Sequence, residues 1–158
     1  MKIGVPKEIK SQENRIGLTP ESVKILTSNG NEVLVENNGG FEAGFYNEQY
    51  KSAGAKILDK AEDIFDDAEI IVKVKEPQPS EVKMIKENQI VFTYLHLAAA
   101  KELTKGLVDS KSVCIAYETV TDNNGRLPLL APMSAVAGRM SVQALSLIHI
   151  SEPTRPLY

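Results

Sequence analysis

Short apolar runs alternate with polar stretches of helical character along most of the chain. Runs rich in valine and isoleucine predict strands at residues 2–5, 32–36, 68–75 and 112–116, with another from residue 90 and a weaker one at 54–57. The polar stretches between these runs predict short helices. Strands that alternate with helices are typical of an α/β fold with a doubly wound, mostly parallel sheet, which is the architecture that we expect here.

Capping residues predict where several helices begin and end. Thr19 is a suitable N-cap for a helix that starts at Pro20, because the first helical position tolerates proline, and Gly30 ends that helix. Ser80 is the expected cap of a helix that runs to Lys86. Further helices are predicted at residues 47–53, 59–66 and 98–106, and small residues predict a last helix at 135–143 that is opened by 132–134.

Composition limits the function classes. The 158 residues suit one globular domain, and a net charge of -3 provides no electrostatic footprint for nucleic acid or for an acidic membrane. The chain has no apolar stretch long enough for a membrane span and no signal peptide, so we expect a cytoplasmic protein. The single cysteine, Cys114, lies in a predicted strand, which favours a buried small residue over a disulfide or a nucleophile.

His96 is the first candidate for chemistry. It lies in the run Ile90–Ala100, which opens as a buried strand and then changes to alanine-rich helical sequence. His96 is therefore expected just beyond the carboxyl end of a parallel strand, which is where open α/β sheets bind ligands, and an imidazole can transfer protons there. If the whole run is instead helical, His96 is an ordinary core histidine.

Three further charged residues are expected at the same edge of the sheet. Arg15 follows the first strand, Lys75 ends the strand beside that of His96, and Glu118 follows a later strand. Arginine can hold a carboxylate through two hydrogen bonds, and lysine can polarise a carbonyl oxygen, so this group suits a small carboxylic acid. Alternatively, these are solvated surface charges. Two histidines and one cysteine show no metal-ligand spacing, and no G-x-G-x-x-G or P-loop motif is present.

Several motifs resemble the amino-terminal domain of the alanine dehydrogenase and nicotinamide nucleotide transhydrogenase family. In family order from Met1 to about Gln143, they are Lys2–Ile9 (KIGVPKEI), Glu13–Pro20 (ENRIGLTP), Gly39–Gly44 (GGFEAG), Val72–Pro77 (VKVKEP), Tyr94–Ala98 (YLHLA), Tyr117–Val120 (YETV) and Leu129–Ser134 (LLAPMS). The match is closest to the alanine dehydrogenases. It implies a Rossmann-like or flavodoxin-like substrate domain.

The resemblance to alanine dehydrogenase implies reversible, NAD-dependent oxidative deamination of L-alanine to pyruvate and ammonia. His96 falls on the family's catalytic acid/base, and Arg15 and Lys75 fall on its substrate-binding pair, with Arg15 on the carboxylate side. Ser134 matches a position that contacts the nicotinamide cofactor, and Glu118 matches a family motif for which we expect a supporting role. The resemblance also implies a homo-oligomer, specifically a hexamer.

Two other functions stay open. The related transhydrogenase alpha subunits bind NAD in a similar domain but typically lack the Lys-Glu-Pro and Leu-His-Leu motifs, so the presence of Lys75 and His96 favours the dehydrogenase. The other possibility is a non-enzymatic domain that binds small carboxylates.

The resemblance stops near Gln143. We expect residues 1–133 to be the substrate domain and residues 134–143 to begin a linker helix toward a missing NAD-binding domain, which leaves the α/β fold incomplete and this chain inactive by itself. Residues Leu145–Arg155 resemble the translation of a transposase adapter used in preparing sequencing libraries, so 144–158 is interpreted as a non-native tail in which His149 is no ligand.

Overall fold

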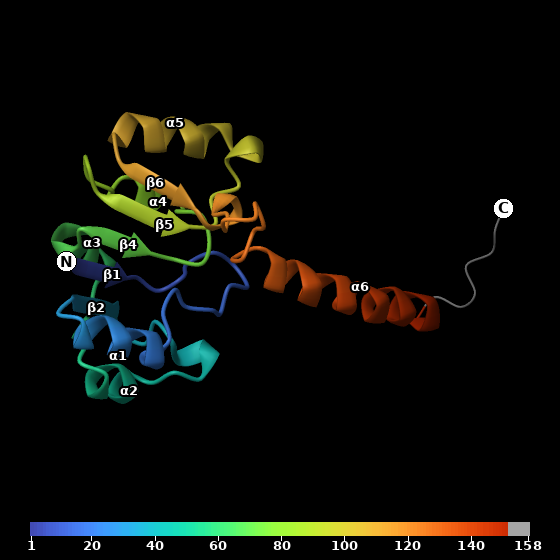
Figure 1. Cartoon of the computed structure of the whole chain (residues 1–158), viewed down its shortest axis with the longest axis horizontal. Helices are drawn as coiled ribbons and strands as arrows, with labels where there is room; N and C mark the ends of the chain where they lie inside the picture. The colour runs from blue at the N-terminus through green and yellow to red at the C-terminus, as the bar shows by residue number, and fades with distance from the viewer. Residues whose placement is uncertain (152–158) are drawn as a thin grey trace. The chain divides into compact units, whose positions relative to one another are not determined.

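The computed structural model describes residues 1–151, and the side chains of residues 1–148. It divides into two units, Met1–Tyr117 and Glu118–Tyr158, and we describe each by itself. The strands of the first unit are β1 (Lys2–Val5), β2 (Glu32–Glu36), β3 (Lys56–Leu58), β4 (Ile70–Val72), β5 (Ile90–Thr93) and β6 (Val113–Ala116). The helices are α1 (Pro20–Ser28), α2 (Asn47–Ser52), α3 (Ala61–Asp67), α4 (Pro79–Val82) and α5 (Lys101–Ser110), with 3-10 turns η1 (Phe41–Ala43), η2 (Leu97–Ala99) and η3 (Tyr117–Thr119), which extends into the second unit (Figure 1).

All the strands of the first unit form one parallel sheet in the order β3-β2-β1-β4-β5-β6. The chain winds outward from β1 to β3 and then returns to the middle for β4 to β6, which is a doubly wound topology and confirms the predicted fold class. The order of the strands reverses between β1 and β4, and the loops that follow these two strands lie where such sheets form a ligand crevice.

Alternate residues of β2 and β4 pack into different cores on the two faces of the sheet. Val33 and Val35 join α1 and α2 in one core, whereas Leu34 between them joins α3 and α5 in the other. β4 follows the same rule, with Val72 in the first core and Ile71 in the second. The continuous apolar runs of the sequence therefore reflect strands that are covered on both faces.

β6 departs from this rule. Cys114 and Ala116 pack partly buried against the core of α3 and α5, but Val113 and Ile115 on the opposite face are 48% and 42% exposed. β6 is one of the two edge strands of the sheet, and this part of its apolar face remains in contact with solvent.

The helix α1 confirms the capping prediction, whereas α4 does not. Thr19 accepts a hydrogen bond from the backbone N–H of Ser22, and Pro20 takes the first helical position. The predicted cap Ser80 is wrong: Gln78 is the N-cap of α4, because Pro79 occupies the first helical position and the Glu81 carboxylate accepts the Gln78 backbone N–H. The helix also ends at Val82 instead of Lys86. The strand predicted at 68–75 is shorter than expected, because β4 spans only Ile70–Val72.

The second unit consists of a polar segment and the helix α6 (Ala131–Ser151). The polar segment turns at Asp122, whose carboxylate accepts the backbone N–H groups of Asn124 and Arg126. α6 begins earlier than the predicted helix at 135–143 and continues into the expected tail, of which residues 152–158 and the side chain of His149 lie outside the described part. Among the described residues, no helix combines the length and apolarity needed to cross a membrane.

Candidate functional site

The loops that carry Arg15 and Lys75 begin on either side of the point where the strand order reverses. Arg15 lies in the long loop between β1 and α1, and Lys75 lies three residues beyond the end of β4. His96 lies three residues beyond the end of β5, the next strand in the sheet. The topology therefore brings these three predicted site residues to the same edge, where ligands bind in sheets of this kind.

Gly17 brings the Arg15 loop close to the end of β4. A Cβ atom at this position would lie 2.6 Å from the carbonyl oxygen of Val72 and 3.2 Å from the backbone nitrogen of Lys73. These neighbours are backbone atoms, which cannot move aside as a flexible side chain could. The absence of a side chain at Gly17 thus allows the two loops to pack backbone against backbone.

The guanidinium of Arg15 is paired with the carboxylate of Glu13. Its Nε donates to Oε1 over 2.8 Å and its Nη2 donates to Oε2 over 2.6 Å, which is a two-point contact. The hydrogen bonds from Arg15, assisted by the charge of nearby Lys75, hold the pKa of Glu13 at about 2, although partial burial opposes the shift. Glu13 therefore stays ionised and occupies two of the donors with which an arginine can hold a carboxylate.

A buried triad fixes the backbone before Lys75. The ammonium of Lys73 lies 3.1 Å from Oε2 of Glu8 and 2.6 Å from Oε1 of Glu81, and all three side chains are at most 2% exposed. We call these three residues the buried triad. Burial raises the pKa of Glu81 despite the opposing charge of Lys73, since the triad places two carboxylates around one ammonium.

The buried triad also holds the peptide groups beside the site. Oε1 of Glu8 accepts the backbone N–H of Val74 over 2.6 Å and that of Lys75 over 3.2 Å. The hydroxyl of Thr93, at the end of β5, donates to the carbonyl of Lys75 over 2.9 Å. The backbone of Lys75 is thus tied both to the loop after β1 and to the neighbouring strand.

His96 lies in an exposed turn at the carboxyl end of β5. Its side chain is 55% exposed, and its backbone has a φ of 51°, a left-handed conformation that non-glycine residues seldom adopt. At this turn the chain leaves the direction of β5 and enters η2. The alternative of a helical core histidine is therefore excluded.

Two carboxylates and an aromatic ring surround the predicted cations. Oε2 of Glu76 lies 3.8 Å from Nδ1 of His96, and the ring of Tyr94 stacks against the imidazole with centroids 6.1 Å apart. Tyr94 packs edge-on against Tyr117, whose pKa is raised by burial and by the charge of nearby Tyr94 and Glu8. We call Arg15, Lys75, His96, Glu13 and Glu76 the edge group.

The carboxylates of the edge group and of the buried triad were missed as functional residues at the level of the sequence. Glu13 precedes Arg15 by two positions in ENR and Glu76 directly follows Lys75 in KEP, and this proximity to a predicted cation was the available signal. Glu8 and Lys73 gave none, because their partners are distant in the chain.

Glu118 and Ser134 belong to the second unit. Glu118 lies in η3, two residues after β6, and Ser134 lies exposed in the first turns of α6, where its backbone N–H donates to the carbonyl of Leu130. Their supporting and cofactor-contacting roles stay predictions.

The edge of the first unit does not fit the pyrophosphate of a dinucleotide. A dinucleotide site of this fold needs a short glycine-rich turn from β1 into the amino terminus of a helix. Here the segment between Val5 and α1 is long and includes the carboxylates of Glu8 and Glu13. Among the described residues, no three potential metal ligands of the His, Cys, Asp or Glu type converge.

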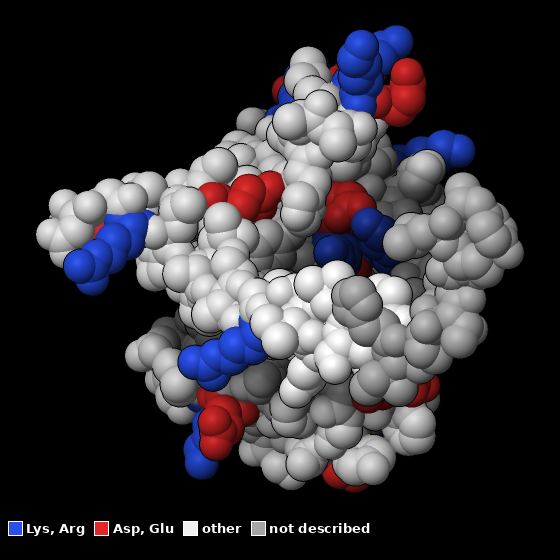
Figure 2. All heavy atoms as spheres, turned by 90° about the vertical axis from the view of Figure 1, so that its right-hand side faces the viewer, with Lys and Arg blue, Asp and Glu red and all other residues white. Residues whose placement is uncertain are grey.

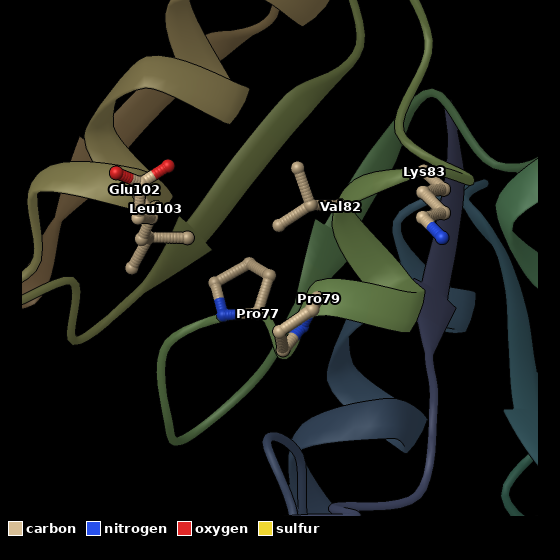
Figure 3. Close-up of a pocket in the computed structure, with 6 residues that line it drawn as sticks. All are labelled: Pro77, Pro79, Val82, Lys83, Glu102 and Leu103. Carbon is tan, nitrogen blue, oxygen red and sulfur yellow. The ribbon is translucent and has the colours of Figure 1, made fainter.

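A separate apolar pocket lies beside the site. Pro77, Pro79, Val82, Lys83, Glu102 and Leu103 line a space of about 240 Å³, in which Pro77, Val82 and Leu103 face one another (Figure 3). None of the predicted site residues lines it. On the face shown in Figure 2, acidic and basic side chains of the described residues lie next to one another at several places.

The comparisons with known proteins agree with the architecture. Residues 4–137 match the family model "Alanine dehydrogenase/PNT, N-terminal domain". The chain belongs to this family. It is 54% identical over 144 residues to an alanine dehydrogenase of Halomonas elongata and 55% identical over 143 residues to one of Staphylococcus epidermidis, which is 91% and 90% of this chain.

The solved structures distinguish the two branches of the family. An L-alanine dehydrogenase is 52% identical and superposes with a TM-score of 0.86 over 90% of this chain, whereas a transhydrogenase from Sinorhizobium meliloti is 25% identical, with a TM-score of 0.73 over 78%. The chain spans about two fifths of the length of the alanine dehydrogenases, 39% of the Halomonas protein and of the solved structure. The likeness to alanine dehydrogenases is thus the stronger in sequence and in structure.

Proposed function

We propose that this chain is the amino-terminal, substrate-binding part of an alanine dehydrogenase that converts L-alanine reversibly to pyruvate and ammonia with NAD. The observation that carries the proposal is the meeting of the Arg15, Lys75 and His96 loops at the carboxyl edge of a sheet in a chain that is more than half identical to alanine dehydrogenases. In this proposal Arg15 binds the substrate carboxylate, Lys75 polarises the carbonyl oxygen of pyruvate and His96 transfers a proton.

The residues that bind NAD are proposed to lie mostly outside this chain. The support is the long, carboxylate-bearing loop after β1, which lacks a glycine-rich turn. NAD supplies the hydride acceptor when it is bound. The described residues would orient the substrate and move its proton, with Ser134 as a contact to the cofactor. Assembly as a homo-hexamer in the cytoplasm belongs to the same proposal.

The test uses two proteins, the 158-residue chain and a completed enzyme. The completed enzyme joins residues 1–143 of this chain to the part of the Staphylococcus epidermidis relative that follows its matched segment. The absorbance of NADH is followed with L-alanine and NAD. We expect the completed enzyme to form NADH and the 158-residue chain to form none.

Two results would contradict the proposal. An inactive but folded completed enzyme that still binds pyruvate would favour the non-enzymatic carboxylate-binding domain. NADH formation by the 158-residue chain alone would show that NAD binds within this chain, against the poor fit of the β1 loop.

A further inference from the structure

The carboxylate of Glu76 is shielded from solvent and faces His96. The Glu76 side chain is 17% exposed, and its Oε2 has no hydrogen-bond partner among the described residues, although it lies 3.8 Å from Nδ1 of His96. A shielded carboxylate oxygen without a donor is costly in free energy. A small rotation of the exposed imidazole would bring Nδ1 within hydrogen-bond range and remove this cost.

The rest of Glu76 is held in place. Its Oε1 forms an ion pair with the ammonium of Lys10, and its carbonyl accepts a hydrogen bond from the side-chain amide of Gln78 over 2.9 Å. Burial would raise the pKa of Glu76, but Lys10 and the neighbouring His96 outweigh burial and hold that pKa below its ordinary value. The carboxylate is therefore ionised at neutral pH and points a fixed acceptor at the imidazole.

We infer that Glu76 is a positioning residue that holds the His96 imidazole with a proton on Nδ1, and so leaves Nε2 to exchange protons with the substrate. The inference rests on the proposed role of His96 as the acid/base. A carboxylate that accepts one N–H of an imidazole fixes both its tautomer and its ring orientation, because the neutral ring carries only one proton. The stacked ring of Tyr94 restricts the same imidazole from its face.

The competing explanation is structural. In that case Glu76 only joins the loop after β1 to the segment after β4 through Lys10. Removing either partner would then have the same effect. Three variants separate the two explanations: Glu76→Met removes the acceptor, Glu76→Gln keeps an acceptor without the charge, and Lys10→Met breaks the ion pair but leaves the carboxylate beside His96.

The first measurement is the tautomer of His96 by ¹⁵N NMR on the 158-residue chain, at about pH 9, where an ordinary imidazole is neutral. A His149→Gln background leaves His96 as the one histidine of the chain. We expect the proton mainly on Nδ1 in the parent and in Lys10→Met, less so in Glu76→Gln, and mainly on Nε2 in Glu76→Met. A proton on Nε2 in the parent, or no difference between the parent and Glu76→Met, would overturn the inference.

The second measurement is steady-state kinetics of the completed enzyme. We expect Glu76→Met to lower kcat by about tenfold or more, as a part of the roughly 10²–10⁴-fold contributed by a general acid/base, with little change in the KM for pyruvate. Glu76→Gln should restore part of kcat, and Lys10→Met should stay near the parent. Equal losses in Glu76→Met and Lys10→Met would support the structural explanation instead.

The two readouts keep this inference separate from the proposed function. If His96→Ala retains normal turnover, the proposed role of His96 fails whatever the tautomer. If His96→Ala is inactive while Glu76→Met keeps the parent tautomer and the parent kcat, only the inference about Glu76 fails.

Discussion

The buried triad and the edge group lie at the same end of the sheet but differ in their contact with water. Lys73 is fully buried between two carboxylates, whereas Arg15 and His96 are 46% and 55% exposed beside one carboxylate each. A buried charge must be paired to be tolerated, so the triad has one arrangement. An exposed cation with a displaceable partner can exchange that partner for a ligand. The difference separates charges that hold the loops from charges that can bind.

The largest expected effect lies in the buried triad. Lys73→Met removes the ammonium and leaves the carboxylates of Glu8 and Glu81 buried without a cation, which should lower the free energy of unfolding by about 3–5 kcal/mol. Urea denaturation of the 158-residue chain measures it. Lys75→Met is the matched control two residues away, and its half-buried side chain should change stability by only about 0.5 kcal/mol. Equal losses of unfolding free energy in Lys73→Met and Lys75→Met would contradict the distinction between the buried triad and the edge group.

Arg15 should matter for binding more than for stability. In the completed enzyme, Arg15→Ala should raise the KM for pyruvate by about 10- to 100-fold, since a charge-assisted hydrogen bond contributes roughly 1.5–3 kcal/mol. The variant also loses the contact that lowers the pKa of Glu13, so its free energy of unfolding should fall modestly, but the chain should stay folded because the guanidinium is nearly half exposed. An unchanged KM would mean that Glu13 is the permanent partner of Arg15 and that the substrate carboxylate binds elsewhere.

The smallest expected effect is the acid response of Glu13. Its pKa in the folded chain is about 2, against an ordinary value of 4.5, so ionised Glu13 stabilises the fold above about pH 4.5. That contribution is lost as the pH falls from 4.5 toward 2. Glu13→Gln should therefore be less stable than the parent at neutral pH and should lose less stability across this window in urea titrations. Parallel pH profiles would contradict the two-point contact with Arg15.

The sequence predicted the sheet because both faces of its central strands are covered. Val33 to Val35 form an unbroken apolar run, and such runs separated by helical stretches fit few topologies. The positions of Lys75 and His96 after neighbouring strands followed from that sheet. The cap of α4 was wrong because Ser80 was chosen by residue type, although Pro79 already fixes the first helical position.

The buried charges could not be predicted from the sequence. Lys73 stands between Val72 and Val74 like any lysine at the end of a strand, and its partner Glu8 is 65 positions earlier in the chain. Only the parallel pairing of β1 with β4 brings the segments after these two strands together. The pairing of Arg15 with Glu13 is local, but nothing in ENR determines whether the arginine turns toward its neighbour or away from it.

The most direct test of the account is the turnover of the completed enzyme with His96→Ala. The central claim is that the edge group carries out the chemistry and that His96 is its acid/base, so kcat for pyruvate reduction should fall by about 10²–10⁴-fold while the unfolding midpoint stays near that of the parent. A kcat within about twofold of the parent, in a variant that is folded and binds pyruvate, would show that the proton is moved by another group and would contradict the account.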